Sequence, residues 1–248
     1  MYCKTNTMTI DFNSDLGEGY GVDKELMPYL DSCSIACGGH YGNALTIETA
    51  LQLALNEQLK VGAHPSYPDT LNFGRQSMKM PLKEFQAAIE KQLDLFFNTL
   101  EKQSIQCHHI KAHGALYSDL YHSPELAGAY LETLSNYPCT LLYAMPHKAF
   151  TVAAEAQYFK LYSEGFLDRR YNEQGYLISR QSNNAQIENT SEIVAQLHDL
   201  VLEKHIPYKN SQGKIAYLAT QIDTVCLHSD HPKAIERAQA IRKAISKI

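Results

Sequence analysis

The sequence of 248 residues lacks the features that would place it in a membrane or on nucleic acid. No apolar run approaches the ~20 residues of a transmembrane helix, and residues 1–7 contain no apolar core of a secretory signal. The net charge of −5 gives no electrostatic reason to expect nucleic acid or an anionic membrane as a partner. These absences favour a cytoplasmic globular protein.

Motifs for common cofactors and nucleophiles are also missing. The six cysteines form no CxxC pair, and most lie in apolar runs, where cysteine acts as a small buried hydrophobe in a reducing compartment. The sequence contains neither a GxxxxGK[ST] phosphate loop nor a GxSxG elbow, and the glycines of residues 17–21 lack the GxGxxG form. Neither a phosphate loop nor a serine-hydrolase site is therefore predicted.

The sequence does contain a regular alternation of strand-like and helix-like segments. Strands are predicted at residues 8–12, 34–37, 60–63, 107–111, 140–143, 159–162 and 223–227. Helices are predicted at residues 23–30, 45–58, 81–103, 124–135, 147–156, 190–204 and 232–245. Because repeated βα units form a parallel sheet, two architectures fit a single domain over residues 1–248: a closed barrel of seven or eight strands, or an open doubly wound sheet.

The first strand leads into a polar stretch. Alternation places Asp11, Asn13 and Asp15 on one face of the extended segment and Phe12 on the other. Three acceptor-rich side chains on one strand face are costly to bury without partners, and the glycines that follow let the backbone turn sharply. We therefore interpret this stretch as part of a functional site, with Asp15 as its chemical member and the other two polar residues as support.

Residues capable of chemistry follow almost every predicted strand. They are Asp15, His40, His64, His113, Glu164, His228 and Asp230. In a parallel barrel the carboxyl ends of the strands meet on one face, where enzymes of this fold hold their active sites. Imidazole and carboxylate groups there could bind a divalent metal or act as general bases, and no spacing such as HExxH decides between these roles.

Positively charged side chains lie beside the same strand ends. Lys111 alternates onto the strand face of His113 and is a candidate for stabilising an anionic substrate or a developing oxyanion. Arg75, Arg169 and Arg170 are candidates for binding a carboxylate or phosphate through two parallel hydrogen bonds. We expect at least one of these arginines to be an ordinary surface residue.

Seven short motifs occur in order along nearly the whole chain. They are residues 11–19 (DFNSDLGEG), 36–40 (ACGGH), 62–69 (GAHPSYPD), 73–75 (FGR), 111–117 (KAHGALY), 164–169 (EGFLDR) and 228–230 (HSD). Each motif alone is weak, but together and in this order they resemble the LamB/YcsF family. The resemblance implies an α/β fold, a seven-stranded β/α (TIM-like) barrel of the glycoside hydrolase/deacetylase type, which agrees with the strand count.

The resemblance also implies an activity and partners. It implies the A subunit of an ATP-dependent 5-oxoprolinase, which opens 5-oxo-L-proline to L-glutamate while ATP is hydrolysed to ADP and phosphate, with subunits B and C as partners. An unstrained lactam is a poor electrophile, so phosphorylation of its amide oxygen would prepare it for attack by water. The missing phosphate loop is compatible with ATP being handled by the partners. A divalent metal and a homo-oligomer are also compatible with the sequence.

Roles for individual residues follow from the same motifs. We expect Asp15 to activate water or hold a metal together with His40 or His64, and Lys111 and His113 to stabilise oxyanion charge. The candidates for substrate binding are Asn13, Glu18, Arg75, Glu164, Arg169, His228 and Asp230. Two other hypotheses stay open: a metal-dependent deacetylase or amidohydrolase, and a non-catalytic subunit that binds the substrate.

The sequence departs from the family pattern at a few positions. The segment Tyr41-Gly42-Asn43-Ala44 stands where the family usually has Ala-Gly-Asp-Pro, so a carboxylate is replaced by an amide. Three further differences are Gln76 for a usual arginine, Ala112 for a usual proline, and Ser229 for a usual glycine. Any charged role of the residue at position 43 is lost.

Overall fold

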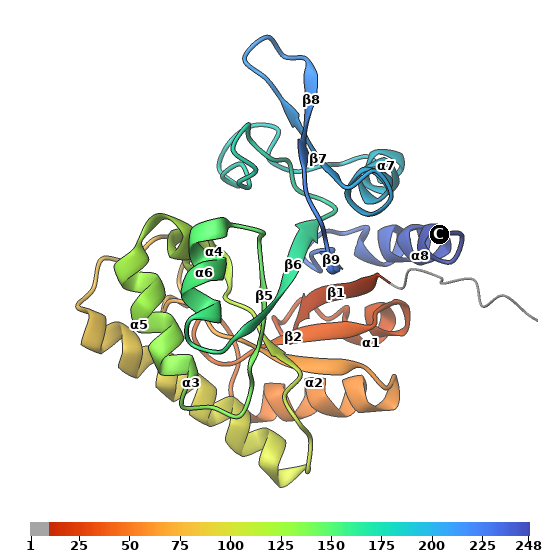
Figure 1. Ribbon diagram of the computed structural model, residues 1–248. Helices are drawn as coiled ribbons and strands as arrows, with labels where there is room; N and C mark the ends of the chain where they lie inside the picture. Colours follow the sequence, from red (N-terminus) through yellow and green to blue (C-terminus); the bar gives the residue numbers. More distant parts are fainter. Residues whose placement is uncertain (1–9) are drawn as a thin grey trace, which may run out of the picture.

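A barrel closed by seven parallel strands forms the centre of the computed structural model, which describes residues 10–248 (Figure 1). The strands are β1 (Asp11–Leu16), β2 (Ser32–Ala36), β3 (Lys60–His64), β4 (His109–Ile110), β5 (Leu141–Ala144), β6 (Lys160–Phe166) and β9 (Thr224–Cys226). Strand β9 closes the barrel by pairing with β1 on one side and β6 on the other. The predicted seven-stranded α/β barrel is confirmed, and the open doubly wound sheet is excluded.

Helices connect the strands and cover the outside of the barrel (Figure 1). They are α1 (Asp23–Leu26), the 3-10 helix η1 (Met27–Tyr29), α2 (Ala44–Asn56), α3 (Leu82–Lys102), α4 (Gly114–His122), α5 (Pro124–Leu134), α6 (Lys148–Glu155), α7 (Thr190–Val201) and α8 (Ala234–Ile245). Helix α3 buries Phe85, Ile89 and Leu93, which lie four residues apart and so share one helical face. Among residues 10–248, none of the helices has the length and apolar character needed to span a bilayer.

The residue at position 43 has a structural role. The Asn43 side chain accepts hydrogen bonds from the backbone N–H groups of Leu45 and Thr46, and the Thr46 side chain accepts one from the Asn43 backbone N–H. This reciprocal capping box satisfies donors that the first turn of α2 would otherwise leave unpaired. An amide performs this function as well as a carboxylate does, so the departure at this position leaves the helix start intact.

Several predicted boundaries are wrong in detail. Strand β1 continues to Leu16, so Asp15 lies within the strand, and residues 8–9 of the predicted strand lie outside the described residues, as do residues 1–7. Strand β4 has only two residues instead of the five predicted at 107–111, and the helix α4 after it was not predicted. Helix α4 starts at Gly114, inside the KAHGALY motif, and this motif was interpreted as part of the site and not as the start of a helix.

A two-stranded antiparallel sheet was also missed. The predicted helix at 190–204 ends at Val201, and β7 (His205–Lys209) follows and pairs with β8 (Ile215–Ala219). Figure 1 shows this hairpin projecting away from the barrel beside α7. Half-buried and exposed residues alternate along β8, as expected of a strand with one face toward solvent. The strand was missed because it is short and lies between longer periodic segments. A short hairpin around Gly175 is closed by the antiparallel pairing of Tyr171 with Leu177.

The interior of the barrel is polar where most barrels of this type are filled by aliphatic side chains. Asp11 accepts hydrogen bonds of 2.7 Å from Ser32 and Thr224, which lie on the two strands beside β1, and one of 3.2 Å from Tyr143 on β5. Phe12, on the opposite face, is fully buried outside the barrel wall. The predicted polar face of β1 therefore points inward, and cross-barrel partners offset its desolvation.

Candidate active site

A cavity of about 590 Å³ lies at the carboxyl ends of the barrel strands. Its wall includes Asp15 from β1, His64 from β3, Lys111 and His113 from the segment after β4, and His228 after β9. Most of these side chains are almost completely buried, so the cavity floor is a low-dielectric environment in which charges interact strongly. The predicted convergence of strand-end residues is therefore found at one cavity, within the size range of small-molecule sites.

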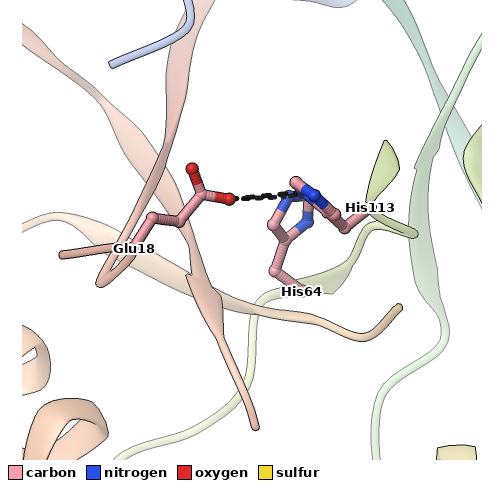
Figure 2. A group of neighbouring side chains, drawn as sticks. All are labelled: Glu18, His64 and His113. Carbon is pink, nitrogen blue, oxygen red and sulfur yellow. Dashed lines mark hydrogen bonds and ion pairs between the residues drawn. The ribbon is translucent and has the colours of Figure 1, made fainter. Parts of the chain in front are cut away.

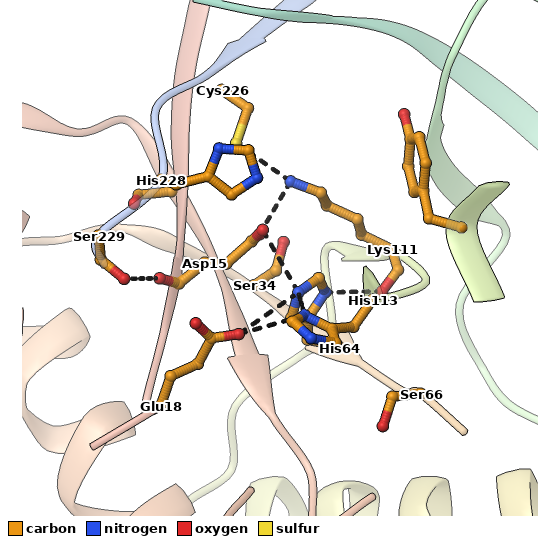
Figure 3. Close-up of polar contacts among 12 residues, drawn as sticks. Asp15, Glu18, Ser34, His64, Ser66, Lys111, His113, Cys226, His228 and Ser229 are labelled. Atoms are coloured by element: carbon orange, nitrogen blue, oxygen red, sulfur yellow. Dashed lines mark hydrogen bonds and ion pairs between the residues drawn. The ribbon is translucent and has the colours of Figure 1, made fainter. Parts of the chain in front are cut away.

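Two histidines on the cavity floor have their ring tautomers fixed by backbone carbonyl groups. His64 Nδ1 lies 2.9 Å from the carbonyl oxygen of Lys111, and His113 Nε2 lies 2.9 Å from that of Phe73. A carbonyl oxygen only accepts hydrogen bonds, so each of these ring nitrogens carries the proton. In the neutral rings the lone pairs are then on His64 Nε2 and His113 Nδ1, which face each other at 3.0 Å (Figures 2 and 3).

A left-handed turn of the backbone at Phe73 and Gly74 accompanies this arrangement. Phe73 and Gly74 have φ values of 54° and 62°, so two consecutive residues adopt the left-handed conformation that turns the Phe73 carbonyl toward His113. Phenylalanine is disfavoured there, and such residues persist where the surrounding structure fixes them, often at functional sites. The Phe73 ring also packs edge-on against His40 at a centroid distance of 5.0 Å. The loop that carries the FGR motif therefore lies over the site.

Glu18 directs a carboxylate oxygen at the same point. Its Oε1 lies 3.2 Å from His113 Nδ1 and 3.8 Å from His64 Nε2 (Figure 3). The same oxygen lies 3.0 Å from His40 Nε2. The hydroxyl of Ser66 donates to the Tyr67 carbonyl and is 3.0 Å from His40 Nδ1, so that nitrogen donates to it. In the neutral ring, Nε2 of His40 then also presents a lone pair to the Glu18 oxygen.

The protonation of this cluster is decided by burial. Burial lowers the pKa of His40 to about 4, with the neighbouring His113 adding to the effect, and burial also lowers the pKa of His113. Burial alone would raise the pKa of Glu18, but His113 and His40, through hydrogen bonds and charge, bring it well below its usual range. Because each neutral ring already donates its proton to another oxygen, the ionised form of Glu18 needs either a further proton on one of these rings or a cation in its place.

The cluster as a whole suits a divalent cation. Glu18, His64 and His113 each offer one ligand atom, and these atoms lie within 4.8 Å of one another (Figure 2). Three converging acceptors without a donor between them repel one another unless a cation or an extra proton lies among them. Two imidazoles and one carboxylate form the donor set of many catalytic zinc sites. The arrangement is compatible with a divalent metal.

Lys111 lies between two carboxylates beside this cluster. Its Nζ is 2.8 Å from Asp15 Oδ1, as an ion pair outside hydrogen-bond geometry, and 2.8 Å from Glu164 Oε1. Burial lowers the pKa of Lys111, but its interactions with Asp15, Cys226 and Glu164 together outweigh burial and raise the net pKa, so the ammonium form is retained. Burial raises the pKa of Asp15, and His64 and Lys111 outweigh it, so that the net pKa lies well below the usual range.

Glu164 and Asn13 support Lys111 from below. Glu164 also accepts hydrogen bonds from Asn13 Nδ2 at 3.1 Å and from the Tyr117 hydroxyl at 3.0 Å. Asn13 Nδ2 in turn lies 2.7 Å from the Thr224 hydroxyl. Glu164 and Asn13 are almost fully buried and neither lines the cavity. The geometry thus places them under the cavity floor, where they hold Lys111 in position.

A second group of charges forms one wall of the cavity. Arg75 Nη2 lies 2.7 Å from Asp230 Oδ2, and Arg180 binds the same oxygen. Arg169 lines the cavity next to Arg180. We call Arg75, Arg169 and Arg180 the arginine wall. Arg170, the remaining candidate from the sequence, is paired at 2.7 Å with Glu192 outside this wall.

Residues 167–189 bring Arg169 and Arg180 to the cavity. Arg169 Nη2 donates to the Ile178 carbonyl at 2.6 Å, which ties the two sides of this segment together. Next to them, Asp168 lies 2.9 Å from His228 Nδ1 and also accepts from the His228 backbone. Arg180 was missed in the sequence because this polar segment has no period and Arg180 belongs to none of the seven motifs. The only sequence feature that could have indicated Arg180 is that it is a positively charged residue in the long loop after β6.

The structure therefore divides the predicted site residues into two groups. Those that line the cavity are Asp15, Glu18, His64, Arg75, Lys111, His113, Arg169 and His228. Those that contact them from behind are Asn13, His40, Glu164 and Asp230. Of the candidates from the sequence, only Arg170 lies neither in the cavity wall nor directly behind it.

Comparison with known proteins identifies the family of this chain. Residues 10–248 match the model of the LamB/YcsF family. The chain belongs to the LamB/YcsF family. Relatives in this family include the 5-oxoprolinase A subunit of Bacillus cereus (strain Q1), which is 35% identical over 94% of this chain and 93% of its own length. Another is the 5-oxoprolinase A subunit of Pyrococcus abyssi, at 34% identity over 96% of this chain and 94% of its own.

A solved structure shows the same LamB/YcsF fold. The crystal structure of the lactam utilization protein from Thermus thermophilus has a TM-score of 0.86 to this chain at 30% sequence identity. The match covers 97% of both chains. The two proteins therefore share one fold over nearly their whole length.

Proposed function

We propose that this chain is the A subunit of a 5-oxoprolinase that cleaves 5-oxo-L-proline to L-glutamate while ATP is hydrolysed to ADP and phosphate. The observation that carries the proposal is the convergence of Glu18, His64 and His113 beside Asp15 and Lys111 on the floor of one cavity. This set offers groups to activate water and to stabilise charge at an amide carbonyl. The names of relatives at 34–35% identity support the choice of substrate.

The chain's own residues would act on the lactam as follows. Asp15 Oδ2, 3.3 Å from His64 Nε2, is placed to accept a proton from water held at the cluster. The Lys111 ammonium, anchored by Glu164, faces the charge that develops on the carbonyl oxygen. Cleavage of the C–N bond leaves an amine, which takes up the proton removed from water. His40 contributes indirectly, because its ring stacks on His113 and lies beside the Glu18 carboxylate.

A divalent metal fits the cluster, and Glu18, His64 and His113 would hold it. When bound, such an ion polarises a carbonyl oxygen or lowers the pKa of a bound water. The tautomers fixed by the carbonyl groups of Lys111 and Phe73 prepare both histidines as ligands. Ser66 likewise fixes the tautomer of His40, whose ring lies beside the Glu18 oxygen but does not belong to the ligand set.

We assign the ATP-handling step to partner subunits B and C. The chain lacks a GxxxxGK[ST] loop, and the names of its relatives imply further subunits. Phosphorylation of the lactam oxygen would make the ring carbon electrophilic enough for water to attack. Cleavage of the C–N bond would then leave an acyl phosphate, and a second water would release phosphate and the free carboxylate of glutamate. The use of ATP places the reaction in the cytoplasm. The pairing of β1 with β9, which joins the two ends of the chain, supports a single domain.

A second candidate function is favoured by the same metal-compatible cluster. A metal-dependent deacetylase or amidohydrolase would use Asp15 with two histidines and would not require ATP. Metal analysis of the purified protein, combined with the assay described next, separates the two. A metal-free preparation with full activity excludes this candidate.

The decisive experiment is an assay of glutamate formation from 5-oxoproline, with and without ATP and with and without subunits B and C. We expect formation to require ATP and to be lost in folded Asp15→Asn and His113→Ala variants, while an Arg170→Ala control outside the cavity retains it. Full activity in either cavity variant would overturn the assigned roles. Absence of ATP-dependent glutamate formation by the complete wild-type complex would overturn the proposed function.

A further inference from the structure

One arginine of the cavity differs from every other arginine of the chain. Arg75, Arg170, Arg180, Arg237 and Arg242 each have a carboxylate oxygen within 3.3 Å. Arg169 has none among the described residues, although only 6% of its surface is exposed. Its Nη2 donates to a backbone carbonyl, and its buried Nε has no partner within residues 10–248. A buried guanidinium is normally paired with an anion, because desolvation of an unpaired charge is costly.

The carboxylates nearest to Arg169 are already engaged. Asp168 accepts from the ring and the backbone of His228 at 2.9–3.3 Å. Asp230 Oδ2 is shared by Arg75 and Arg180. Burial lowers the pKa of Arg169 to about 10, and the like charge of Arg180 adds to the effect. The arginine wall therefore carries more positive charge than its own carboxylates balance.

Lys111 does not compete for an anionic ligand. Its ammonium is balanced by Asp15 and Glu164, each at 2.8 Å, so an incoming anion would meet two negative charges as well as one positive one. The uncompensated positive charge of this cavity lies on the arginine wall instead. Arg169 and Arg180 line the same space as Glu18, His64 and His113, so one small ligand could contact both sides.

We infer that Arg169 and Arg180 form an oxyanion-binding subsite, which takes the carboxylate of the lactam acid while the ring amide lies toward Glu18, His64 and His113. The planar guanidinium of Arg169 suits bidentate binding of a carboxylate. Arg180 reaches the same group if it exchanges its bond to Asp230 for one to the ligand. This assignment of the carboxylate rests on the proposed function, whereas the oxyanion subsite itself does not.

Binding of small probes to the full chain tests the subsite. The probes are 5-oxoproline, 2-pyrrolidinone, which is the same lactam without the carboxylate, and inorganic phosphate. The variants are Arg169→Met and Arg180→Met, with Arg170→Met as the matched control on the adjacent, externally paired arginine. Calorimetric titration of each probe gives its affinity, and thermal melting shows whether each variant is folded.

The expected result is a loss of affinity for 5-oxoproline of roughly 10- to 100-fold in Arg169→Met, with a smaller loss in Arg180→Met and none in the control. The affinity for 2-pyrrolidinone stays the same in all variants. Unchanged binding of 5-oxoproline in folded Arg169→Met and Arg180→Met would overturn the inference.

Phosphate separates the subsite from the proposed function. If the wild-type chain binds neither lactam but binds phosphate in a manner that depends on Arg169, the oxyanion subsite stands and the lactam substrate does not. If phosphate binds as tightly as 5-oxoproline and both depend on Arg169, the subsite stands for oxyanions generally. If no probe depends on Arg169 or Arg180, the subsite is wrong whatever the substrate.

Discussion

Replacing Glu18 by glutamine should remove most of the stabilisation that a divalent cation gives to the folded chain. The substitution keeps the size of the side chain but removes the anionic oxygen that lies 3.2 Å from His113 Nδ1 and 3.8 Å from His64 Nε2. A cation present at 100 times its dissociation constant stabilises the wild-type chain by ~2.7 kcal/mol. For a chain of this length that corresponds to a rise in Tm of ~5–11 °C.

The loss in the variant can be bounded from the same relation. Removal of a partner that merely orients a ligand weakens metal binding by ~10–100-fold, and Glu18 is a ligand itself. With a 100-fold weaker affinity, the same cation concentration stabilises the variant by only ~0.4 kcal/mol. The Tm rise then falls to ~1–2 °C. The variant should therefore be almost indifferent to the cation.

The assay is thermal melting of chelator-treated protein with and without Zn²⁺, Mn²⁺ or Ni²⁺. His122→Gln is the matched control, because His122 lines the cavity but does not belong to the cluster. The control should keep the wild-type response. Two results would refute the reasoning: a wild-type chain whose Tm does not respond to any of the cations, or a Glu18→Gln chain that responds as strongly as the wild type.

Two further predictions concern buried charges. Lys111→Met leaves two buried carboxylates without their cation and should lower the free energy of unfolding at pH 7 by about 3–5 kcal/mol. Urea titration measures this change, and a loss of less than about 1 kcal/mol would contradict the prediction. Burial raises the pKa of Asp168, but His228 and the nearby arginines together outweigh burial, and the net pKa is lowered. The ionised Asp168 therefore stabilises the fold above the unfolded pKa of ~3.9, and this stabilisation is lost as pH falls through the lower folded value. The stability difference between the wild type and Asp168→Asn should thus be constant above about pH 5 and narrow below ~pH 4 in pH-dependent urea titrations; a difference that persists unchanged to about pH 2 would contradict it.

The sequence predicted the convergence of the site because topology alone requires it. Once parallel strands alternate with helices, the residues after each strand must meet at one end of the barrel. Asp15, His64 and His113 illustrate this, since each follows or ends a different strand. Alternation with a period of two also placed Asp11, Asn13 and Asp15 on one strand face, and the structure shows that this face points into the barrel.

The chemical state of the cluster could not be predicted in this way. The lone pair of His113 is on Nδ1 only because the Phe73 carbonyl, forty residues earlier, binds the other nitrogen. That contact depends on two left-handed residues in a loop without periodic pattern. The same holds for Arg180, whose position is set by the path of residues 167–189 over the barrel end. Long-range contacts of loops carry no local sequence signal, so they become visible only in the folded chain.

The distribution of charge in the cavity fixes which way round a lactam acid would bind. Its carboxylate and its amide carbonyl are both polar, so shape alone does not distinguish the two orientations. The arginine wall has positive charge to spare, whereas the floor contains the carboxylates of Asp15 and Glu18, with Lys111 already shared between Asp15 and Glu164. A carboxylate turned toward the floor would lie beside the Asp15 carboxylate and would meet a Lys111 ammonium that Asp15 and Glu164 already balance. The carboxylate therefore belongs on the arginine wall, which brings the ring amide to the histidine cluster where the bond must be broken.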